Sequence, residues 1–544
     1  MKIKIILVVA VVVVFLAISD EWAGIDAADN KVFFNIRDYG AKGDGATLDT
    51  GAINKAIETA ASKGGGTVYF PAGTYLSFSI RLKSNITIYL DNGATLLAAD
   101  PAVHKGKYDQ WEPNEFDMYQ DFGHSHWQNS LLWGIGIENF AIIGQGKIDG
   151  KGLSKRSPGP RRPRTAGETP TSMANNPSPL GELSPLTEMD GLGTKAIALK
   201  LSKNITLKDF TIFQGGHFAL LATGVDNLTI DGLRVDTNRD GFDIDACRNV
   251  RISNVYVNSP NDDAIVLKSS YALGFNRATE NVTITNSQVS GFDLGTFLDG
   301  TFKTTQEFAP DKDRVTGRLK FGTESNGGFK NITISNINFV HCRGLALETV
   351  DGGYIEDISI SNITMRDITT APIFIRLGKR QRAPEGTPIA KIRRVNIDNV
   401  VVSNAHHEYA SIIAGLTESP IEDVRLSNIR IHYKGGGTAA DAVREIPENE
   451  KNYPEPSMFG VTPSYGFYVR HAKGITFDNV KMTYEKPEAR PAFFLDDVKD
   501  LDFFRIDAQP TFAFFMLKNV ENFNVQQSKG VKDQRIERAE KKEY

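Results

Sequence analysis

The sequence predicts an all-β protein folded as a right-handed parallel β-helix, with a short N-terminal capping helix. Three observations predict this fold: a recurring strand phrase, a repeat spacing of about one coil, and a helical pattern near the start of the repeats. The phrase is a run of alternating β-branched residues around a central Asn or Asp, found as KNITLKDFTI, DNLTIDGLRV, RNVRISNVYV, ENVTITNSQV, KNITISNINF, EDISISNITM, RRVNIDNVVV, EDVRLSNIRI and KGITFDNVKM. Alternation with period two is typical of strands, and self-similarity at a fixed period is typical of solenoids.

The spacing of the phrase sets the architecture. From Asn204 to Asn227 and on to Asn249 the steps are 23 and 22 residues, about one coil of a parallel β-helix. Later steps are longer, which fits loops inserted at the corners. A propeller or a β-sandwich would show Gly-rich turns and hairpin dipeptides, and the chain has few of these.

Four copies of the phrase also contain an Asn-x-Thr sequon. Its asparagines are Asn204, Asn227, Asn281 and Asn331. They resemble glycosylation acceptors, but they lie at the starts of predicted buried strands. We therefore expect their side chains to turn the corner through local backbone hydrogen bonds, while the threonines supply strand propensity.

The two ends of the coil need covers, because an open strand edge pairs with other chains. GAINKAIETAASKGGG places Ile53, Ala56, Ile57 and Ala60 at helical spacing before a glycine-rich stop, which predicts the capping helix. The charged stretch KGVKDQRIERAEKKEY is predicted to be a frayed or weakly helical tail. We divide the chain into a signal peptide (1–28), a β-helical domain (31–528) and a charged tail (529–544).

The N-terminus and the overall composition limit where the protein works and what it binds. Two lysines, an apolar run and then small residues predict a secretory signal peptide and export to the periplasm or the exterior. The alternative is an uncleaved signal anchor. We expect no stable membrane association after cleavage, and the near balance of 62 basic and 66 acidic residues predicts no nucleic-acid binding. The assembly state is not predicted.

The two cysteines are predicted to remain unpaired. Cys247 and Cys342 lie several repeats apart, and coils stacked about 4.8 Å apart would hold their Cα atoms beyond the span of a disulfide. We expect two small buried hydrophobic residues instead.

The candidate site lies in NRDGFDIDACRNVRISNVYVNSPNDDAIVLKSS. Its aspartates are Asp240, Asp243, Asp245, Asp262 and Asp263. Asp240 and Asp262 are 22 residues apart, so we expect them at equivalent places on adjacent coils, with Asp263 alongside. Repulsion would raise the pKa of at least one carboxyl, and an acid beside a carboxylate is what glycosidic cleavage needs. His217, one coil earlier, would contact a carboxylate or a sugar hydroxyl. A calcium site and a solvated surface are the alternatives.

At these residues the sequence resembles glycoside hydrolase family 28, the polygalacturonase family of pectin-degrading enzymes. NRDG (238–241) and NDD (261–263) resemble the family's Asn-Thr-Asp-Gly and Gly-Asp-Asp, and IRDYGAKGDG, IIGQGKIDGKG and GTESNGGFKNITISN resemble it too. The resemblance implies a right-handed parallel β-helix with a catalytic domain over 31–528. It implies hydrolysis with inversion, no metal or other cofactor, and a pectic polysaccharide or oligosaccharide as substrate.

The resemblance also implies roles for single residues. Asp262 would be the general acid that protonates the leaving oxygen. Asp240 and Asp263 would position and deprotonate the attacking water. Lys268 matches a family lysine that binds sugar or lowers carboxylate pKa values.

Two departures from the family concern substrate binding. The histidine of the family's Gly-His-Gly segment is replaced here by Gly317 or Arg318, and its Arg-Ile-Lys segment aligns with ALE (346–348). The second change disfavours an anionic sugar at that subsite. We expect other cations on the same face to bind the substrate carboxylate in its place, although each is alternatively a solvated surface charge. These cations are Arg239, Arg318, Lys320 and Arg376.

Two insertions interrupt the early coils. YDQWEPNEFDMYQDFGHSHWQNSLLW is rich in aromatic residues that would either stack on sugars or attach the loop to the coil, and KRSPGPRRPRTAGETPTSMANNPSPLGELSPL is Pro-rich with a basic head. Loops that close one end of a groove predict exo cleavage, of a galacturonide or a rhamnogalacturonan linkage. A pectate lyase with calcium and an arginine base, and a non-catalytic carbohydrate-binding β-helix, are the competing functions.

Overall fold

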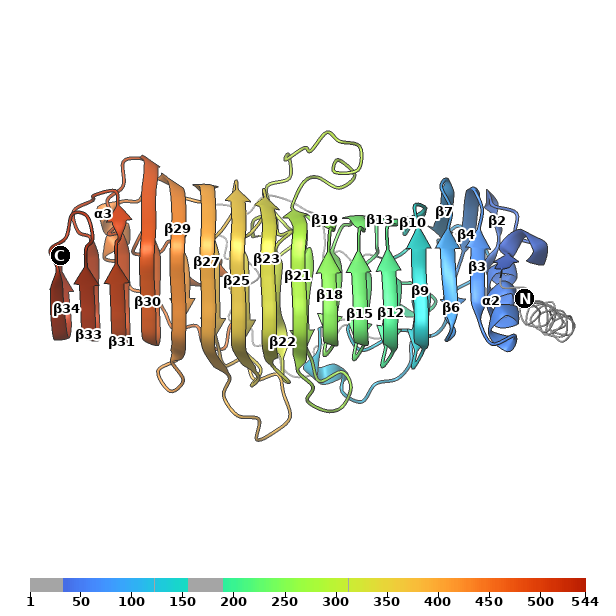
Figure 1. The fold of residues 1–544 in the computed structure, drawn as a ribbon, viewed down its shortest axis with the longest axis horizontal. Coiled ribbons are helices and arrows are strands. Elements are labelled where there is room, and N and C mark those ends of the chain that lie inside the picture. The colour runs from blue at the N-terminus through green and yellow to red at the C-terminus, as the bar shows by residue number, and fades with distance from the viewer. Residues whose placement is uncertain (1–32, 122, 155–188, 312) are drawn as a thin grey trace, which may run out of the picture.

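The computed structural model describes residues 33–121, 123–154, 189–311 and 313–544. In these residues the chain winds into one long spiral whose strands stack side by side along the long axis (Figure 1), which confirms the predicted parallel β-helix. The predicted signal peptide (1–28) and the Pro-rich insertion (155–186) lie outside the described residues. Within the described part, the helices are too short or too polar to traverse a bilayer.

Three faces run along the spiral, each built from strands that pair in parallel with the equivalent strand of the next coil. Face 1 contains β5 (Ile80–Arg81), β8 (Ser130–Ile135), β11 (Lys195–Lys200), β14 (Phe218–Thr223), β17 (Asp240–Asp245), β20 (Ile265–Ser269), β22 (Leu319–Ser325), β24 (Leu345–Thr349), β26 (Ile373–Leu377) and β28 (Ser411–Ala414). Face 2 contains β1 (Phe33–Asn35), β3 (Gly66–Phe70), β6 (Ile86–Leu90), β9 (Glu138–Gly144), β12 (Lys203–Lys208), β15 (Asp226–Asp231) and β18 (Arg248–Ser253). Face 3 contains β2 (Asp44–Leu48), β4 (Gly73–Ser77), β7 (Ala94–Ala98), β10 (Lys147–Asp149), β13 (Thr211–Phe213), β16 (Arg234–Asp236), β19 (Tyr256–Asn258) and β32 (Asp507–Ala508).

Longer strands complete the later coils by bending from one face to the next. From face 2 to face 3 run β21 (Thr279–Ser290), β23 (Phe329–Val340), β25 (Tyr354–Arg366), β27 (Lys391–Ala405) and β29 (Ile421–Gly435). From face 1 into face 2 run β30 (Phe467–Lys486), which continues to face 3, β31 (Phe493–Phe504) and β33 (Phe515–Gln526).

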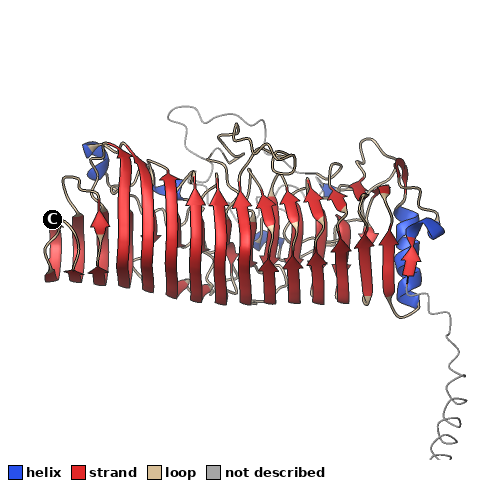
Figure 2. Cartoon of the chain, turned by 45° about the horizontal axis from the view of Figure 1, so that its top comes forward, coloured by secondary structure: helices blue, strands red, loops and turns tan. Residues whose placement is uncertain are grey.

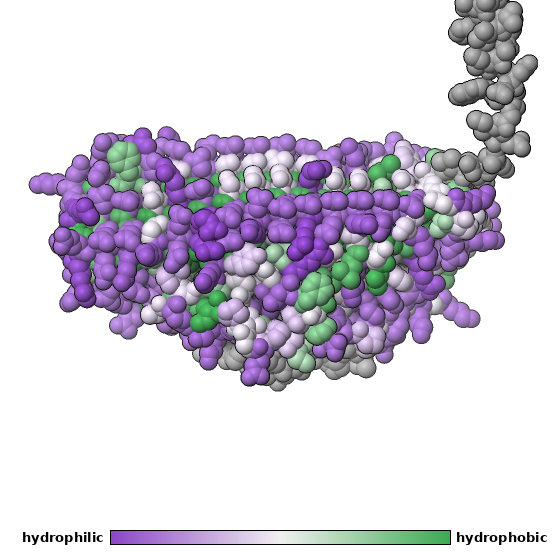
Figure 3. Space-filling view, turned by 60° about the horizontal axis from the view of Figure 1, so that its bottom comes forward, coloured by the Kyte–Doolittle hydropathy of each residue, from purple (hydrophilic) through white to green (hydrophobic). Residues whose placement is uncertain are grey.

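The core follows from the register of this pairing. Ile205 pairs with Leu228, and Leu228 with Val250, so inward apolar residues of successive coils stack on one another. Burying each such side chain stabilises the fold by roughly 1.5–3 kcal/mol relative to leaving it exposed. The outward positions stack in the same way, and Figure 3 shows the resulting lengthwise rows of polar and paler side chains. Equivalent residues 22 or 23 positions apart therefore become neighbours.

The sequon asparagines hold the corners by a different route from the one expected. Asn204, Asn227, Asn281 and Asn331 have φ between 54° and 58°, the left-handed region that Asn tolerates better than most residues. Their side chains bond to one another between coils rather than to the local backbone. Asn227 donates to Asn204 over 2.9 Å and Asn331 donates to Asn281 over 2.8 Å. Because the corners of successive coils stack on one another, each asparagine side chain lies closer to the asparagine of the next coil than to a free group of its own backbone.

The N-terminal end is covered as predicted. Helix α2 (Thr50–Ser62) lies against β1 and β3, and its buried residues Ile53, Ala56, Ile57 and Ala60 are those of the sequence pattern. The other helical elements in the described part of the chain are short: η1 (Ile36–Tyr39), η2 (Asp117–Tyr119), α3 (Ala439–Ala442) and η5 (Pro456–Phe459).

The C-terminal end differs from the prediction of a frayed or weakly helical tail. Residues Gln534–Glu543 form β34, which pairs antiparallel with β33 and covers the last open strand edge. The unpaired N–H and C=O groups of β33 favour a strand here, because a further strand satisfies them. The charges of the segment then stay exposed on the new edge.

Cys247 and Cys342 are both buried and unpaired, as the sequence predicts.

Long insertions leave the coils near the middle of the spiral, where Figure 2 shows tan loops gathered. Three of them matter for the site: residues 99–129 before β8, residues 291–318 between β21 and β22, and residues 436–466 between β29 and β30.

Candidate active site

Three carboxyl groups meet on face 1, as the one-coil spacing predicts. Asp240 opens β17, and Asp262 and Asp263 lie on the turn that leads into β20, the strand paired with β17. One carboxylate oxygen of each residue lies within 4.8 Å of an oxygen of the other two. The turns that carry them are tied together, because the Asn261 side chain donates to the Asn238 side chain over 2.9 Å.

The three carboxyl groups differ in exposure. Asp240 and Asp263 are each 4% exposed, whereas the Asp262 side chain is 26% exposed. Asp262 is therefore the member of the group that a molecule arriving from solvent meets first.

The surroundings move two of the pKa values in opposite directions. Burial, together with the charges of Asp262 and Asp243, raises the pKa of Asp240 well above its ordinary value. Burial would also raise the pKa of Asp263, but Lys320 and Arg318 outweigh it and hold that pKa below its ordinary value. The surroundings thus favour a protonated carboxyl at Asp240 next to an ionised one at Asp263.

Three of the predicted substrate-binding cations contact these carboxylates directly. Arg239 bonds Asp262 over 2.6 Å, Arg318 bonds Asp263 over 2.9 Å, and Lys320 lies 3.3 Å from Asp263. Arg318 and Lys320 are almost fully buried, which excludes the alternative that they are solvated surface charges.

Lys268 forms a second ion cluster beside the first. Its ammonium lies 3.3 Å from Asp243 and 3.3 Å from Glu324, and it also contacts His124. His124 comes from the insertion 99–129 and bonds Asp243 over 2.9 Å. Lys268 therefore compensates buried carboxylates near Asp240, in line with its predicted effect on carboxyl pKa values.

His217 and Arg376 have different surroundings. His217 is buried on the coil before Asp240, and burial together with the charge of Arg239 lowers its pKa well below the ordinary value, which favours the neutral ring. Arg376 lies three coils beyond Lys268 on face 1. Its guanidinium is buried and bonds the carbonyls of Gly415 and Glu448 over 3.1 and 3.0 Å, so the structure does not bring it to the carboxylates.

Sequence reasoning missed the contribution of the insertion 436–466. Glu455 binds Arg318 through two hydrogen bonds of 3.0 and 2.6 Å and also binds Arg343 over 2.8 Å. Tyr453 accepts a hydrogen bond from Lys320 over 3.1 Å. No periodicity marks these residues in the sequence, because the insertion belongs to no strand.

Two insertions cover face 1 on either side of the three carboxylates. On the N-terminal side, Trp127 of the insertion 99–129 packs on Phe218 and Leu221 and donates to Thr223 over 3.1 Å. On the C-terminal side, Met458 and Phe459 of the insertion 436–466 pack on outward residues of β24 to β30. Trp127 is fully buried, so it attaches the loop to the coil and is not exposed for sugar stacking.

Among the residues that the structure describes, two groups have ligand atoms close enough for a metal ion: His124 with Asp240 and Asp243, and Asp240 with Asp262 and Asp263. Cationic side chains already contact three of these carboxylates, Lys268 at Asp243, Arg239 at Asp262, and Arg318 with Lys320 at Asp263. This compensation by side chains does not favour a divalent cation. The absence of a metal requirement stays a prediction.

Comparisons with known proteins point to pectin-degrading enzymes. Residues 114–296 match the model of glycosyl hydrolases family 28, and residues 33–148 match that of rhamnogalacturonase A/epimerase, pectate lyase-like. A probable polygalacturonase of Vitis vinifera is 24% identical over 422 residues, 73% of each chain. An exo-poly-alpha-D-galacturonosidase of Dickeya chrysanthemi is 36% identical over 129 residues, 22% of this chain and 20% of that one.

Among solved structures, the family 28 exopolygalacturonase of Yersinia enterocolitica has the same fold, with a TM-score of 0.62 and 20% identity. The superposition covers 88% of this chain and 79% of that one. The family 28 match contains Asp240, Asp262 and Asp263, the three carboxylates that the coil gathers on face 1. Over residues 114–296 the chain is therefore similar to glycosyl hydrolases family 28.

Proposed function

We propose that this protein is an exported, inverting hydrolase that removes sugar units from the end of a pectic galacturonide chain. The observation that carries the proposal is the group formed by Asp240, Asp262 and Asp263, in which one carboxyl is biased toward protonation and another toward ionisation. General acid and base catalysis of glycosidic cleavage requires that pairing.

In the proposed reaction, water attacks the anomeric carbon and gives a proton to the Asp263 carboxylate, while the bond from that carbon to the leaving oxygen breaks. Asp240 carries the proton of the resting site, because burial and the charge of Asp262 raise its pKa. Asp240 passes this proton to Asp262, the exposed member of the group, and Asp262 delivers it to the leaving oxygen. Asp240 positions the water together with Asp263.

Inversion rests on the family resemblance and not on the separation of the carboxyl groups. Inverting pairs usually lie about 6.5–9.5 Å apart and retaining pairs about 5–5.5 Å apart. The oxygens here lie within 4.8 Å. However, Asp263 is bound by both Arg318 and Lys320, and these contacts hold its oxygens away from a covalent bond with sugar. The anomeric form of the first product decides between the two outcomes.

Exo action is supported by the two insertions that flank the carboxylates along the spiral. A polymer that is cut in mid-chain has to extend in both directions from the cleavage point, and the packed residues around Trp127 and Phe459 cover face 1 in both directions. The Dickeya relative is also described as an exo-enzyme.

An anionic sugar still needs a cation, although the family's Arg-Ile-Lys segment is absent. Arg318 and Lys320 are buried by their contacts with Asp263 and Glu455, whereas the Arg239 side chain is 18% exposed beside Asp262. We assign the carboxylate contact to Arg239.

The test is product analysis with polygalacturonate and defined oligogalacturonides. We expect one short product from the earliest time points, slow loss of viscosity, and a first product of inverted anomeric configuration by proton NMR. Unsaturated products that absorb in the ultraviolet and need calcium would indicate a lyase instead.

Asp262→Asn should lower turnover by roughly 10²–10⁴-fold, because it removes the proton donor, while the thermal midpoint stays close to that of the parent. Asp299→Asn, on an exposed turn, is the matched control and should retain full turnover. Equal activity of the two variants would refute the assignment, and binding without any product would favour a non-catalytic role.

A further inference from the structure

A second surface of the spiral has the features of a polysaccharide-binding site. On face 3, one outward position of each coil is stacked in register along the molecule. In chain order this row contains Thr95, Lys147, Thr211, Arg234, Tyr256, Gln288, Asn338, Thr364, Val401, Arg430, Lys481, Asp507 and Lys529. The side chains are exposed or half-buried, and they alternate with buried core residues.

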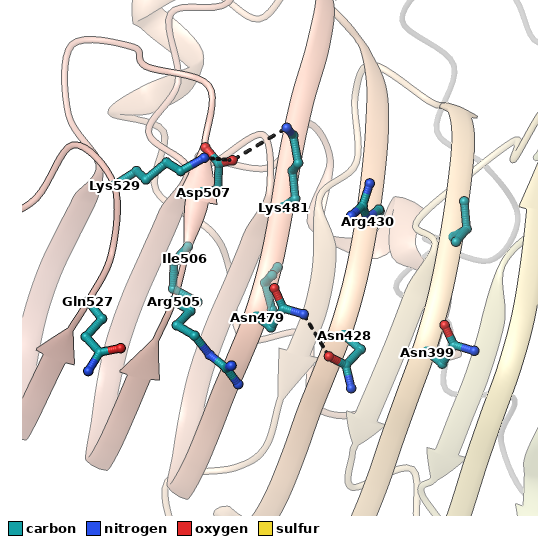
Figure 4. Close-up of a pocket in the computed structure, with 12 residues that line it drawn as sticks. Asn399, Asn428, Arg430, Asn479, Lys481, Arg505, Ile506, Asp507, Gln527 and Lys529 are labelled. Atoms are coloured by element: carbon teal, nitrogen blue, oxygen red, sulfur yellow. Dashed lines mark hydrogen bonds and ion pairs between the residues drawn. The ribbon is translucent and has the colours of Figure 1, made fainter.

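The C-terminal part of this row borders a pocket of about 680 Å³. The pocket lies along the corner between faces 2 and 3, where Asn399, Asn428 and Asn479 stack on successive coils (Figure 4). Asn479 donates to Asn428 over 2.8 Å. Two residues further along the same strands, Arg430 and Lys481 extend beside Asn428 and Asn479 (Figure 4). Amide groups beside cations suit a ligand that carries both hydroxyl and carboxylate groups.

The charge of the pocket is positive although the protein has a net charge of −4. Asp507 is shared by Lys481 and Lys529, at 3.5 and 2.8 Å. Asp478, next to the pocket, is shared by Arg425 and Arg505, at 3.0 and 2.6 Å. Each carboxylate therefore compensates one of two cations.

Arg430 adds a further positive charge to the same pocket. The ion pairs found in the described residues do not include it. The residues that line the pocket include four cations, Arg430, Lys481, Arg505 and Lys529, and one carboxylate, Asp507, which leaves an excess of three positive charges. An anionic polymer is the complementary ligand.

A second pocket of about 740 Å³ lies on the same row nearer the N-terminus. Lys147 and Arg234 line it, together with the rings of Tyr256 and Phe297. Aromatic rings beside cations suit the apolar faces and the carboxylates of an acidic sugar. Both pockets follow the long axis, so a chain that lies along face 3 can reach either of them.

This surface is separate from the catalytic one. The three carboxylates lie on face 1, and the pocket residues come from strands of faces 2 and 3. We propose that an acidic polysaccharide binds along face 3 through Arg430, Lys481 and Lys529, and holds the enzyme on its polymeric substrate between cleavage events. The inference rests on the proposed function for the identity of the polymer.

The test compares two triple variants on polymeric and short substrates. Arg430→Ala, Lys481→Ala and Lys529→Ala remove the pocket cations. Lys55→Ala, Lys83→Ala and Lys541→Ala remove three exposed lysines elsewhere on the chain. Binding to polygalacturonate is measured by affinity electrophoresis in an Asp262→Asn background, over a series of salt concentrations. Hydrolysis of the polymer and of a trimer is measured in the active background.

We expect the pocket variant to bind polygalacturonate about tenfold more weakly than the control variant, with a smaller salt dependence. Its KM for the polymer should rise while kcat and trimer hydrolysis stay unchanged. Binding to fully methyl-esterified pectin, which carries no carboxylates, should not respond to the pocket variant.

Equal affinity of the two triple variants for polygalacturonate would overturn the inference, even if hydrolysis proceeds as proposed. If the parent hydrolyses no galacturonide yet binds polygalacturonate through the pocket, the proposed function fails and the binding site stands. Thermal midpoints of both variants establish that the fold is intact.

Discussion

At the scale of single residues, the site is a set of buried carboxylates held by buried cations. Arg318 contacts Asp263 and Glu455, and Lys320 contacts Asp263 and Glu348. Charges in this environment are costly unless each has a partner. Glu348 has the poorest contacts of the set, because its oxygens lie 3.5 and 3.6 Å from Lys320 and Arg318 and accept no hydrogen bond.

Glu348 is therefore expected to make stability depend on pH. Burial raises its pKa from 4.5 to about 8, even though Lys320 and Arg318 oppose the shift. The folded protein then binds a proton that the unfolded chain has released, so the contribution of Glu348 lowers stability as pH rises from about 4.5 to about 8.

Glu348→Gln removes this contribution. We expect the thermal midpoint of the variant to match the parent at about pH 5 and to exceed it at about pH 9, because glutamine resembles the protonated acid. Thermal unfolding of both proteins over that range checks the prediction. Parallel curves, with a constant difference between the midpoints, would contradict it.

At the scale of elements, the insertion 436–466 covers face 1 beside the site and also supplies a carboxylate to the buried cations of the site. Its apolar residues Met458 and Phe459 pack on the outside of face 1, and Glu455 reaches the guanidinium groups of Arg318 and Arg343. The insertion is thus fixed at two places, by apolar packing over the later coils and by an ion cluster beside Asp263.

Glu455→Gln is expected to destabilise the protein by about 3–5 kcal/mol, because it leaves two buried guanidinium groups short of a negative partner. Urea unfolding followed by circular dichroism measures the change. Glu422→Gln on the exposed face of β29 is the control and should change stability by less than about 0.5 kcal/mol. A loss at Glu455 as small as that of the control would show that the cluster does not hold the insertion.

At the scale of the whole molecule, the spiral depends on covers at its ends. α2 covers the first coil with apolar residues, and β34 covers the last by pairing with β33. β34 is rich in both basic and acidic residues, and charges on an edge strand discourage pairing with a further chain.

Deletion of residues 531–544 is expected to expose the edge of β33 and to cause association that increases with protein concentration. Light scattering after size-exclusion chromatography measures it. A full-length variant with Lys541→Gln and Lys542→Gln controls for the lost charge. If the truncated protein stays as monodisperse as that control, β34 is not needed to protect the edge.

The sequence predicts the coil and its three carboxylates because both depend on a period. One coil is 22 or 23 residues long, so the spacing of Asp240 and Asp262 is enough to place them on adjacent coils. Glu455 and His124 could not be found this way, because insertions follow no strand register. The prediction that groups Arg376 with the site is wrong. The sequence pattern gives the charge of Arg376 and its face of the coil, but it does not reveal the insertion that buries the guanidinium.

The C-terminal segment shows a further limit of sequence patterns. Its high charge predicts a tail, yet it forms β34, because the exposed edge of β33 offers hydrogen-bond partners that composition does not reveal. Tertiary context decides the structure of such a segment.

The ion clusters of face 1 join parts of the chain that are synthesised far apart in time. His124 leaves the ribosome before the coil that carries Lys268, and Glu455 leaves it well after Arg318. Early coils can stack on one another as they emerge, but Arg318 and Arg343 bind Glu455 only after the insertion 436–466 has been synthesised. A nascent chain that stops before the insertion 436–466 would consequently hold all three aspartates and the cations that bind them, and still lack the carboxylate that balances Arg318 and Arg343.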